Sequence, residues 1–432
     1  MNALWRVAYA GAAGVARALV AVAPTSERKL WRGLARRRGL LQRLEQWSAA
    51  HRDPSRPLLW MHAPSVGEGL QARVVLERLR ARRPDVQIAF TFFSPSAESF
   101  AASVPADVRD YLPIDTARDV RRALTALRPT ALVFCKLDVW PILTAEATAR
   151  GVRVGLISGT VGPESSRLRA PARALLRDAY FALDVAGAIA ATDAERLITL
   201  GARQERVHVT GDSRCDQVWA RARATDLSSP LLTRIASARP TLVAGSTWPS
   251  DEEALLPAWL HVRKTLATAQ LIIAPHEPTD AHLVPIEQWA AKNNLVLRRL
   301  GQLDDSVAAD VLLVDRVGVL GDLYAIALCA YVGGGFHRAG LHSVLEPAAF
   351  GAPVLFGPRH TNSGDAAALL AAGGAESAAT SAALAAQLLR WLADRPERDR
   401  AGQRALRVVE AGLGAADRSC DLVLELLAPL HR

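Results

Sequence analysis

The segment HAPSVGEG, residues 62–69, places a glutamate between two glycines, where an apolar run gives way to a helix-like pattern. A carboxylate at the carboxyl end of a strand can act as a general base that takes a proton from a hydroxyl group. Gly67 and Gly69 leave room for a ligand to approach the backbone beside Glu68. The same carboxylate could instead only stabilise the helix N-terminus through the helix dipole. The position of Glu68 by itself leaves both roles open.

A second group of residues with chemical potential lies in the C-terminal half, in three segments that each follow an apolar run. These are VAGSTWPSDEE with Ser246 and Thr247, IIAPHEP with His276, and AYVGGGFHRAGLHSVLEP with Gly333, Gly334, Gly335, His342, Ser343 and Glu346. Free amides where the glycine turn enters a helix, near His342 and Ser343, can hold a phosphate. Glu346 lies where ribose hydroxyls could bind. Each segment alone could be a cap or a loop, but three at one edge of a sheet predict a nucleotide pocket.

Spacing argues against two other kinds of site. When G-x-G-x-x-G is started at Gly333, Arg338 stands where a dinucleotide-binding turn needs its third glycine. The cysteines are far apart, which argues against a zinc site or a disulfide framework and for a reducing compartment; they are Cys135, Cys215, Cys329 and Cys420. No D-x-D motif occurs, which favours metal-independent chemistry.

The elements that must position these residues alternate regularly from residue 57 onward. Short apolar runs predict strands, and segments with apolar residues three and four positions apart predict helices, such as the one expected to begin near Leu70. Fully apolar strands alternating with helices indicate a parallel sheet covered on both faces. The pattern breaks at the polar residues 228–230 and resumes at 241.

The sequence therefore predicts an α/β protein with two doubly wound, Rossmann-like domains, residues 51–222 and 223–432. Ligands are expected at the carboxyl ends of the strands, in a cleft between the domains. The pattern leaves open whether the last helix packs back on the N-terminal domain.

Residues 1–50 have a different character. An apolar stretch at 7–24 contains Arg17 and falls short of the roughly 20 apolar residues that span a bilayer. It is followed by Arg28, Lys29, Arg32, Arg36, Arg37, Arg38 and Arg43. An apolar helix followed by cations, in a chain of net charge +9, favours attachment to an anionic membrane face. The alternative is a packed helix with a solvated basic face. Without a recognised module, nucleic acid is not an expected partner.

Eight motifs occur in an order that resembles the 3-deoxy-D-manno-octulosonic acid (Kdo) transferase family. They are HAPSVGEG, TFFSPSAES, YLPIDT, CKLDVWP, VTGDSRCDQV, AGSTWPSDEE, IIAPHEP and YVGGGFHRAGLHSVLEPAAFGAPVLFGP. The resemblance implies a GT-B fold, a CMP-Kdo donor with no further cofactor or metal, and a lipid A precursor as acceptor. It also implies attachment to the cytoplasmic face of the inner membrane.

The resemblance assigns roles to individual residues. Glu68 matches the catalytic base of an inverting transfer, in an S-x-G-E motif that begins at Ser65. The glycine turn 333–335 matches the turn facing the CMP phosphate, and Glu346 matches the acid of N-x-x-E. Lys136 and Asp138 stand where the more familiar pattern has two glutamates, His276 replaces an arginine, and Leu341 and Ser343 replace a glycine and an asparagine. Some branches carry K-x-[DE]-x-W and A-P-H-E, so the first two departures fit an alternative type.

Three residues are expected to contact Kdo or the acceptor beside Ser65. Lys136 could bind the Kdo carboxylate or an acceptor phosphate, or could pair with Asp138. Arg214 could contact the departing phosphate with His276, or could be neutralised between Asp212 and Asp216. The basic N-terminal segment could also meet acceptor phosphates.

Two rival functions remain open at this point. One is another GT-B enzyme that uses a UDP-sugar, such as a lipid-linked N-acetylglucosamine transferase or a nucleotide-sugar epimerase. The other is a non-catalytic membrane protein that senses nucleotide or anionic lipid, which predicts that Glu68→Ala leaves function unchanged.

Overall fold

A computed structural model describes residues 3–24, 26, 28–235, 237–302, 309–361 and 363–429, with side chains from residue 7 onward. The chain divides into unit 1, Met1–Gln217 with Leu413–Arg432, and unit 2, Val218–Gly412. The sequence pattern placed this boundary five residues later and left open whether the last helix packs back on the N-terminal domain. The structure assigns the last helix to unit 1.

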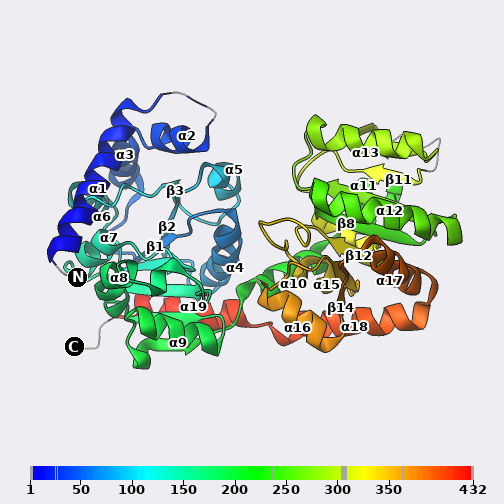
Figure 1. Ribbon diagram of the computed structural model, residues 1–432. Helices are drawn as coiled ribbons and strands as arrows, with labels where there is room; N and C mark the ends of the chain where they lie inside the picture. The colour runs from blue at the N-terminus through cyan, green and yellow to red at the C-terminus, as the bar shows by residue number, and fades with distance from the viewer. Residues whose placement is uncertain are drawn as a thin grey trace. The chain divides into compact units, whose positions relative to one another are not determined.

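Unit 1 contains a seven-stranded parallel sheet in the order β3-β2-β1-β4-β5-β6-β7 (Figure 1). Its strands are β1 Leu58–His62, β2 Gln87–Phe92, β3 Val108–Tyr111, β4 Ala131–Cys135, β5 Arg153–Gly159, β6 Val185–Ala188 and β7 Val207–Val209. The strand order reverses between β1 and β4, which pair directly from Leu59 with Ala131 to His62 with Phe134. This reversal is the point at which doubly wound sheets bind ligands.

Helices cover both faces of this sheet. The helices of unit 1 are α1 Ala3–Val22, α2 Lys29–Arg36, α3 Leu40–His51, α4 Val66–Arg82, α5 Glu98–Ala101, α6 Ala117–Leu127, α7 Pro141–Thr148, α8 Ala172–Phe181, α9 Ala191–Leu200 and α19 Ala415–Leu427. Helix α10, Ser213–Ala224, begins in unit 1 and ends in unit 2. Helix α19 packs on β5, where a Cβ at Gly155 would lie 2.5 Å from Leu426 Cδ1. The absence of a side chain at Gly155 therefore makes room for the returning helix.

Unit 2 repeats the plan with a parallel sheet of order β10-β11-β9-β8-β12-β13-β14. Its strands are β8 Thr241–Thr247, β9 Gln270–Pro275, β10 Leu297–Arg299, β11 Val311–Leu313, β12 Cys329–Val332, β13 Val354–Phe356 and β14 Ala375–Ser377. Its helices are α11 Pro230–Ile235, α12 Pro249–Thr265, α13 Asp280–Lys292, α14 Leu320–Leu323, α15 Leu345–Ala349, α16 Gly364–Ala372, α17 Ser381–Ala393 and α18 Arg395–Ala411. The reversal here falls between β8 and β12.

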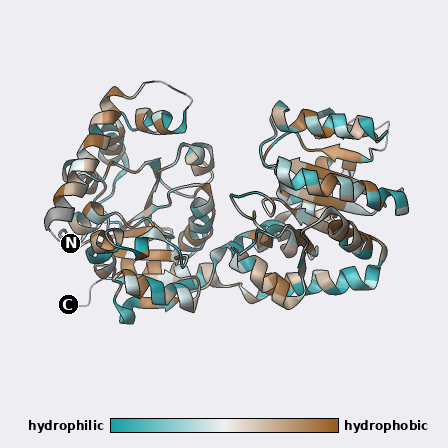
Figure 2. Cartoon of the chain, in the orientation of Figure 1, coloured by the Kyte–Doolittle hydropathy of each residue, from teal (hydrophilic) through white to brown (hydrophobic). Residues whose placement is uncertain are grey.

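The inner strands β9, β11, β12 and β13 of unit 2 are mostly apolar because both faces of the sheet are covered (Figure 2). The edge strands β10 and β14 carry charged residues, Arg298, Arg299 and Glu376. On β9, Leu271 and Ile273 belong to one core cluster, and Ile272, pointing the other way, belongs to a second. This continuous burial is why the sequence showed unbroken apolar runs rather than alternation. The predicted fold class is confirmed. Two short strands, β3 and β14, were not individually predicted.

Helix α1 packs against unit 1 through polar contacts. Arg17 Nε lies 2.9 Å from both carboxylate oxygens of Asp119, and the Tyr9 hydroxyl donates to Asp115 at 2.7 Å. Asp115 also accepts the amides of Ile142 and Leu143 at the start of α7. Among the helices described, none is long and apolar enough to cross a membrane.

The basic segment after α1 is largely engaged in contacts within unit 1. Arg37 is 6% exposed and donates to the carbonyl oxygens of Leu112, Gly33 and Phe93. Burial lowers the Arg37 pKa to about 10, against the opposing effects of Tyr111 and Asp110. Other members of the segment pair with acids or carbonyls: Arg32 and Arg36 with Glu98, Arg43 with Asp110, and Arg38 with the carbonyl of Val20. Much of this charge therefore anchors the segment to its own unit.

Candidate active site

The candidate site of unit 1 is the junction between β1 and α4. Helix α4 begins at Val66, four residues before the expected start near Leu70, so Glu68 lies in its first turn. The flanking glycines have different surroundings. A Cβ at Gly67 would meet nothing within 4 Å, whereas one at Gly69 would lie 2.4 Å from the Phe100 ring. Gly67 leaves open space for a ligand, and Gly69 is required by packing.

Glu68 is held by two neighbours. Lys136 Nζ lies 2.9 Å from Glu68 Oε1, and the Ser65 hydroxyl donates to Oε2. Lys136 follows β4 and has a φ of 73°, a left-handed conformation that is costly for a residue with a side chain. Because β1 and β4 are neighbours at the reversal of strand order, residues 68 positions apart meet at the carboxyl edge of the sheet.

The environment keeps the Glu68 carboxylate ionised. Burial raises the pKa of this carboxyl, but the charge of Lys136 and the hydrogen bonds from Ser65 and Lys136 outweigh burial, so the net pKa lies below its ordinary value. The Glu68 side chain is 13% exposed and that of Lys136 is 42% exposed. A shielded carboxylate thus lies beside a more accessible ammonium group.

The other residues predicted at this edge are paired. Asp138 accepts from Arg167 Nη2 at 2.6 Å, so the suggested Lys136–Asp138 pair is replaced by Lys136–Glu68 and Arg167–Asp138. Burial raises the Asp138 pKa, and Arg167 opposes this. Arg167 follows β5 and was not singled out, because nothing in its local sequence marks it.

Arg214 pairs with Asp212, at 2.8 Å from its Nε. Gln71 on α4 donates to the same carboxylate at 3.0 Å. Asp216 takes a different role from the one suggested, since it accepts the amides of Gly414 and Ala416 at the start of α19. Arg214 therefore shares its charge with Asp212, one of the two aspartates that the sequence offered as its partners.

The centre of the site in unit 2 is Asp251, which sequence reasoning missed. This carboxylate is fully buried and accepts from the amides of Trp248, Gly334 and Phe336 and from the Tyr331 hydroxyl, at 2.8–3.0 Å. It therefore joins the segment after β8 to the glycine turn after β12. Asp251 is the third residue of α12, and an acid at that position commonly accepts the backbone amide of the N-cap residue, here Trp248. This capping pattern could have identified Asp251 from the sequence.

The glycine turn is held mostly by internal bonds. The Gly333 amide donates to the Gly245 carbonyl at 2.9 Å and the Gly334 amide to Asp251, so neither is free for a phosphate. Helix α15 begins at Leu345, later than the expected start near His342 and Ser343. Within the described ranges, the amides of residues 343–346 donate to no protein acceptor. The Gly335 amide also donates to no acceptor among the described residues, so free amides lie both in the turn and about ten residues beyond it.

Gly333→Ala is expected to disrupt this turn. An added Cβ would lie 2.1 Å from the Ser246 carbonyl oxygen and 2.7 Å from Thr247 Cα, and neither backbone atom can move independently. We expect a loss of about 2–4 kcal/mol in the free energy of unfolding, measured by chemical denaturation. Gly364→Ala is the control, because a Cβ there meets nothing within 4 Å at the start of α16. Equal stability of the two variants would contradict the prediction.

The other residues that the sequence predicted to bind the sugar-nucleotide donor lie near Trp248. Its ring lies 4.6 Å from that of His276, and its Nε1 donates to His342 Nε2 at 2.9 Å. Ser246 has a φ of 54° and lets its carbonyl approach Gly333. The Thr247 hydroxyl donates to Glu252 at 2.8 Å, so its partner is a buried side chain of its own unit.

Glu346 lies on α15 and is half-buried. Burial raises its pKa, while the charge of Arg221 lowers it. The Glu346 charge in turn adds to the effect of burial in raising the pKa of Tyr324. Arg221, on α10, also contacts Asp322 at 3.5 Å and was not anticipated from the sequence.

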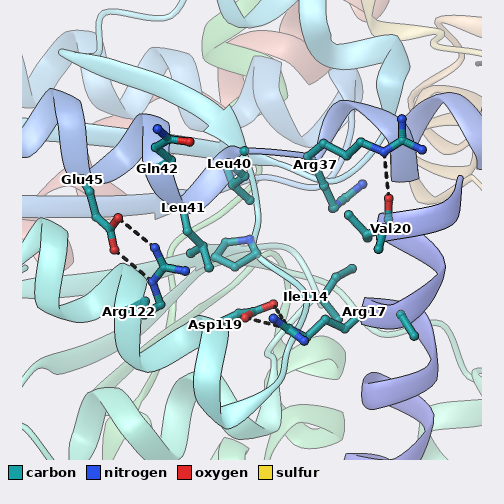
Figure 3. A pocket seen from close by; sticks show the side chains of 15 residues that line it. Arg17, Val20, Arg37, Leu40, Leu41, Gln42, Glu45, Ile114, Asp119 and Arg122 are labelled. Atoms are coloured by element: carbon teal, nitrogen blue, oxygen red, sulfur yellow. Dashed lines mark hydrogen bonds and ion pairs between the residues drawn. The ribbon is translucent and has the colours of Figure 1, made fainter.

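A separate pocket of about 690 Å³ lies among α1, α3 and α6 (Figure 3). Its apolar wall includes Val20, Leu40, Leu41 and Ile114. Of its charged residues, Arg17 pairs with Asp119 and Arg122 with Glu45, whereas Arg37 and Arg38 donate to backbone carbonyls. It contains neither Glu68 nor Lys136.

Comparisons of sequence identify relatives across most of the chain. A family model described as 3-deoxy-D-manno-octulosonic-acid transferase (kdotransferase) matches residues 33–217. The 3-deoxy-D-manno-octulosonic acid transferase of Bordetella pertussis is 30% identical over 85% of this chain and 87% of its own length. That of Haemophilus influenzae is 25% identical over 84% and 86%.

Comparison of structures gives the fold. UDP-GlcNAc 2-epimerase from Neisseria meningitidis, solved with UDP-GlcNAc, aligns with a TM-score of 0.63 over 86% of this chain and 99% of its own. The two sequences are 13% identical, so the likeness concerns architecture only. Two doubly wound domains of the GT-B type are common to both.

Proposed function

This chain belongs to the 3-deoxy-D-manno-octulosonic acid transferase family and is a glycosyltransferase, and we propose that it moves Kdo from CMP-Kdo to a lipid A precursor with Glu68 as general base. The observation that carries the proposal is the ionised, shielded Glu68 carboxylate at the strand reversal of unit 1. It lies where doubly wound sheets bind their ligands.

The proposed reaction is a single displacement. A Glu68 carboxylate oxygen accepts the proton of a glucosamine hydroxyl on the acceptor as that oxygen forms a bond to the anomeric carbon of Kdo. The bond from that carbon to the CMP phosphate breaks, CMP leaves with the electron pair, and the anomeric centre inverts. General-base assistance of this kind is typically worth about 10²–10⁴-fold.

Cations beside Glu68 suit a donor that carries a carboxylate and a phosphate. The Lys136 ammonium is the more exposed partner of its ion pair and can bind an anionic substrate oxygen while staying near Glu68. Arg167 and Arg214 add positive charge, each shared with an aspartate. In unit 2, the free amides of residues 343–346 and the His276 side chain are the proposed contacts of the departing phosphate. We propose that no cofactor or metal takes part.

Lys136→Gln is expected to shift the acidic limb of the kcat/KM profile to higher pH. Burial raises the Glu68 pKa, and Lys136 is the largest opposing influence, so its loss moves that pKa upward. Glu68 acts only as the ionised base, so activity is then lost at a higher pH as the solution is acidified. Lys264→Gln, at an exposed position of α12, is the control. An acidic limb that stays in place, or moves to lower pH, contradicts the role of Lys136.

We also propose that α1 lies against the cytoplasmic face of the inner membrane. Val7, Val15 and Val22 are 71%, 63% and 71% exposed. The 3.6-residue period puts them on the opposite side of α1 from Tyr9 and Arg17, which contact unit 1. This apolar strip suits a helix that lies in the plane of the interface.

The pair Val7→Asp and Val15→Asp is expected to weaken binding to vesicles that contain anionic phospholipid. Burying one valine side chain is worth about 1.5 kcal/mol, so losing two, about 3 kcal/mol, lowers the partition coefficient by somewhat more than about a hundredfold. Vesicle flotation measures it. Val209→Asp, at a 55% exposed site on β7, is the matched control. Equal binding by all variants would reject the strip as the contact surface.

The direct test of function is a reconstituted assay. Purified enzyme is given CMP-Kdo generated in situ and lipid A precursor, and mass spectrometry counts the sugars added to the lipid. We expect a mass increase of one or more Kdo residues, and inhibition by CMP stronger than by UDP. Turnover with a UDP-sugar and none with CMP-Kdo would overturn the proposed donor.

A further inference from the structure

The imidazoles around Trp248 form a feature that the proposed reaction does not explain. Trp248 precedes α12, and its ring stacks on His337 at 4.4 Å with the planes 12° apart. His276 lies 4.6 Å from the same ring and 4.4 Å from His342. These rings come from segments after β8, β9 and β12, so the contact is set by the sheet.

The hydrogen bond between Trp248 and His342 has only one possible direction. An indole N–H is a donor and never an acceptor. His342 Nε2, 2.9 Å away, must therefore supply a lone pair. A charged imidazolium has protons on both nitrogens and could not accept this bond. The contact consequently fixes His342 as a neutral ring whose one proton is on Nδ1.

The surroundings of His342 also oppose a positive charge. Burial lowers its pKa to about 4; His276 and His337 act in the same direction, and Asp251 opposes them. His276, His337 and Asp251 are the titratable groups that act on this ring. The ring is thus uncharged at neutral pH for reasons beyond the single hydrogen bond.

The proton on Nδ1 is available to a ligand. The Cδ2 edge of His342 faces the glycine turn, where a Cβ at Gly334 would lie 3.2 Å from Cδ2. Nδ1 is on the other edge, the ring is half-buried, and no atom in the described part of the chain accepts from Nδ1. The site therefore presents an oriented, uncharged N–H donor that is free of a protein partner.

We propose that Trp248 is a positioning residue that holds His342 in its neutral Nδ1–H form, so that this N–H donates to an anionic oxygen of the sugar-nucleotide donor. The identity of that donor rests on the proposed function, whereas the tautomer does not. The indole does not touch the donor and acts only through His342. Because the Trp248–His342 bond fixes which nitrogen carries the proton, the sugar-nucleotide meets an Nδ1–H group that is already oriented toward it.

The test combines ¹⁵N-histidine NMR of the ligand-free enzyme with steady-state kinetics on CMP-Kdo. Two-bond ¹⁵N–¹H correlations distinguish the two neutral tautomers and the charged ring, and the spectrum of His342→Gln assigns the signal. We expect the Nδ1–H form in the wild type and a shift toward Nε2–H in Trp248→Phe. Loss of the oriented donor should raise the KM for CMP-Kdo about tenfold, with a smaller change in kcat.

Trp289→Phe is the matched control, because that half-buried indole N–H has no hydrogen-bond partner. It should leave both the His342 signal and the KM unchanged. An Nε2–H or charged His342 in the wild type overturns the proposal, as does an unchanged tautomer in Trp248→Phe. A changed tautomer with an unchanged KM overturns the contact with the donor.

Two further arms keep the outcomes separate. If Trp248→Phe folds poorly, the hydrogen bond is tested in the wild type by a through-bond ¹⁵N–¹⁵N coupling between the Trp248 indole and His342. Its presence supports the hydrogen bond, and its absence rejects it. If the wild type fails to turn over CMP-Kdo, the proposed function fails, while the tautomer measured without ligand still supports or rejects the role of Trp248.

Discussion

Glu68→Gln is expected to lower kcat/KM for Kdo transfer by about 10²–10⁴-fold. The amide keeps the size of the side chain and can still accept from Ser65, but it cannot take a proton from the acceptor hydroxyl. The free energy of unfolding should change by no more than about 1 kcal/mol, because the partner Lys136 is 42% exposed and solvent screens the ion pair. Initial rates and chemical denaturation of the same preparation measure both effects.

Glu77→Gln provides the matched control for this variant. Glu77 lies on the same helix, is 48% exposed and, among the residues that the structure describes, pairs only with Arg73 at 3.5 Å. Its loss should therefore leave the rate unchanged. A Glu68→Gln enzyme with a rate within about threefold of wild type would falsify the general-base assignment. It would also favour the alternative reading, in which Glu68 only stabilises the start of α4.

Asp251→Ala is expected to cost more than about 4 kcal/mol of unfolding free energy in unit 2. Asp251 is fully buried and accepts bonds from three amides and the Tyr331 hydroxyl. Removing the carboxylate leaves these donors without an acceptor, at about 1–3 kcal/mol each. Chemical denaturation with hydrogen exchange at the amides of Gly334 and Phe336 would localise the loss.

The adjacent Glu253→Ala is the control, because Glu253 is exposed on the same turn of α12. Asp251→Asn should fall between the two, since the amide keeps one acceptor oxygen but turns an NH₂ group toward N–H donors. Equal free energies of unfolding for Asp251→Ala and Glu253→Ala would contradict the prediction. They would mean that Asp251 does not hold the glycine turn to the segment after β8. The KM for CMP-Kdo is expected to rise with the loss of this link.

Local pattern was enough to predict the strands that carry the site, because each is a continuous apolar run ending in small or polar residues. The β1 strand was predicted over LLWMHA, residues 58–63, against Leu58–His62 in the structure, and β8 was predicted at 241–246 against Thr241–Thr247. Helix starts were less accurate. Glycine weakens a helix, so Gly67 and Gly69 concealed that α4 begins at Val66.

Candidate site residues were predicted where they lie in a sequence motif. They were missed where only their contacts in the folded structure identify them. Glu68 and Lys136 each lie in a recognisable segment, yet their pairing depends on β1 lying beside β4. Arg167 and Arg221 carry no local signal, because arginines are frequent in this chain and only their neighbours distinguish them. The glycine turn was located correctly, but the amides of Gly333 and Gly334 donate to Gly245 and Asp251.

The sequence by itself determined the α/β class, the two sheets and the family, since these follow from periodicity and from motifs that are contiguous in the chain. Only the tertiary structure decided that Lys136 pairs with Glu68, that Asp251 joins two loops 83 residues apart, and that α19 returns to unit 1. The physical reason is that these contacts depend on strand order and on the packing of distant segments. A local apolar pattern encodes which residues are buried, but not which strand lies beside which.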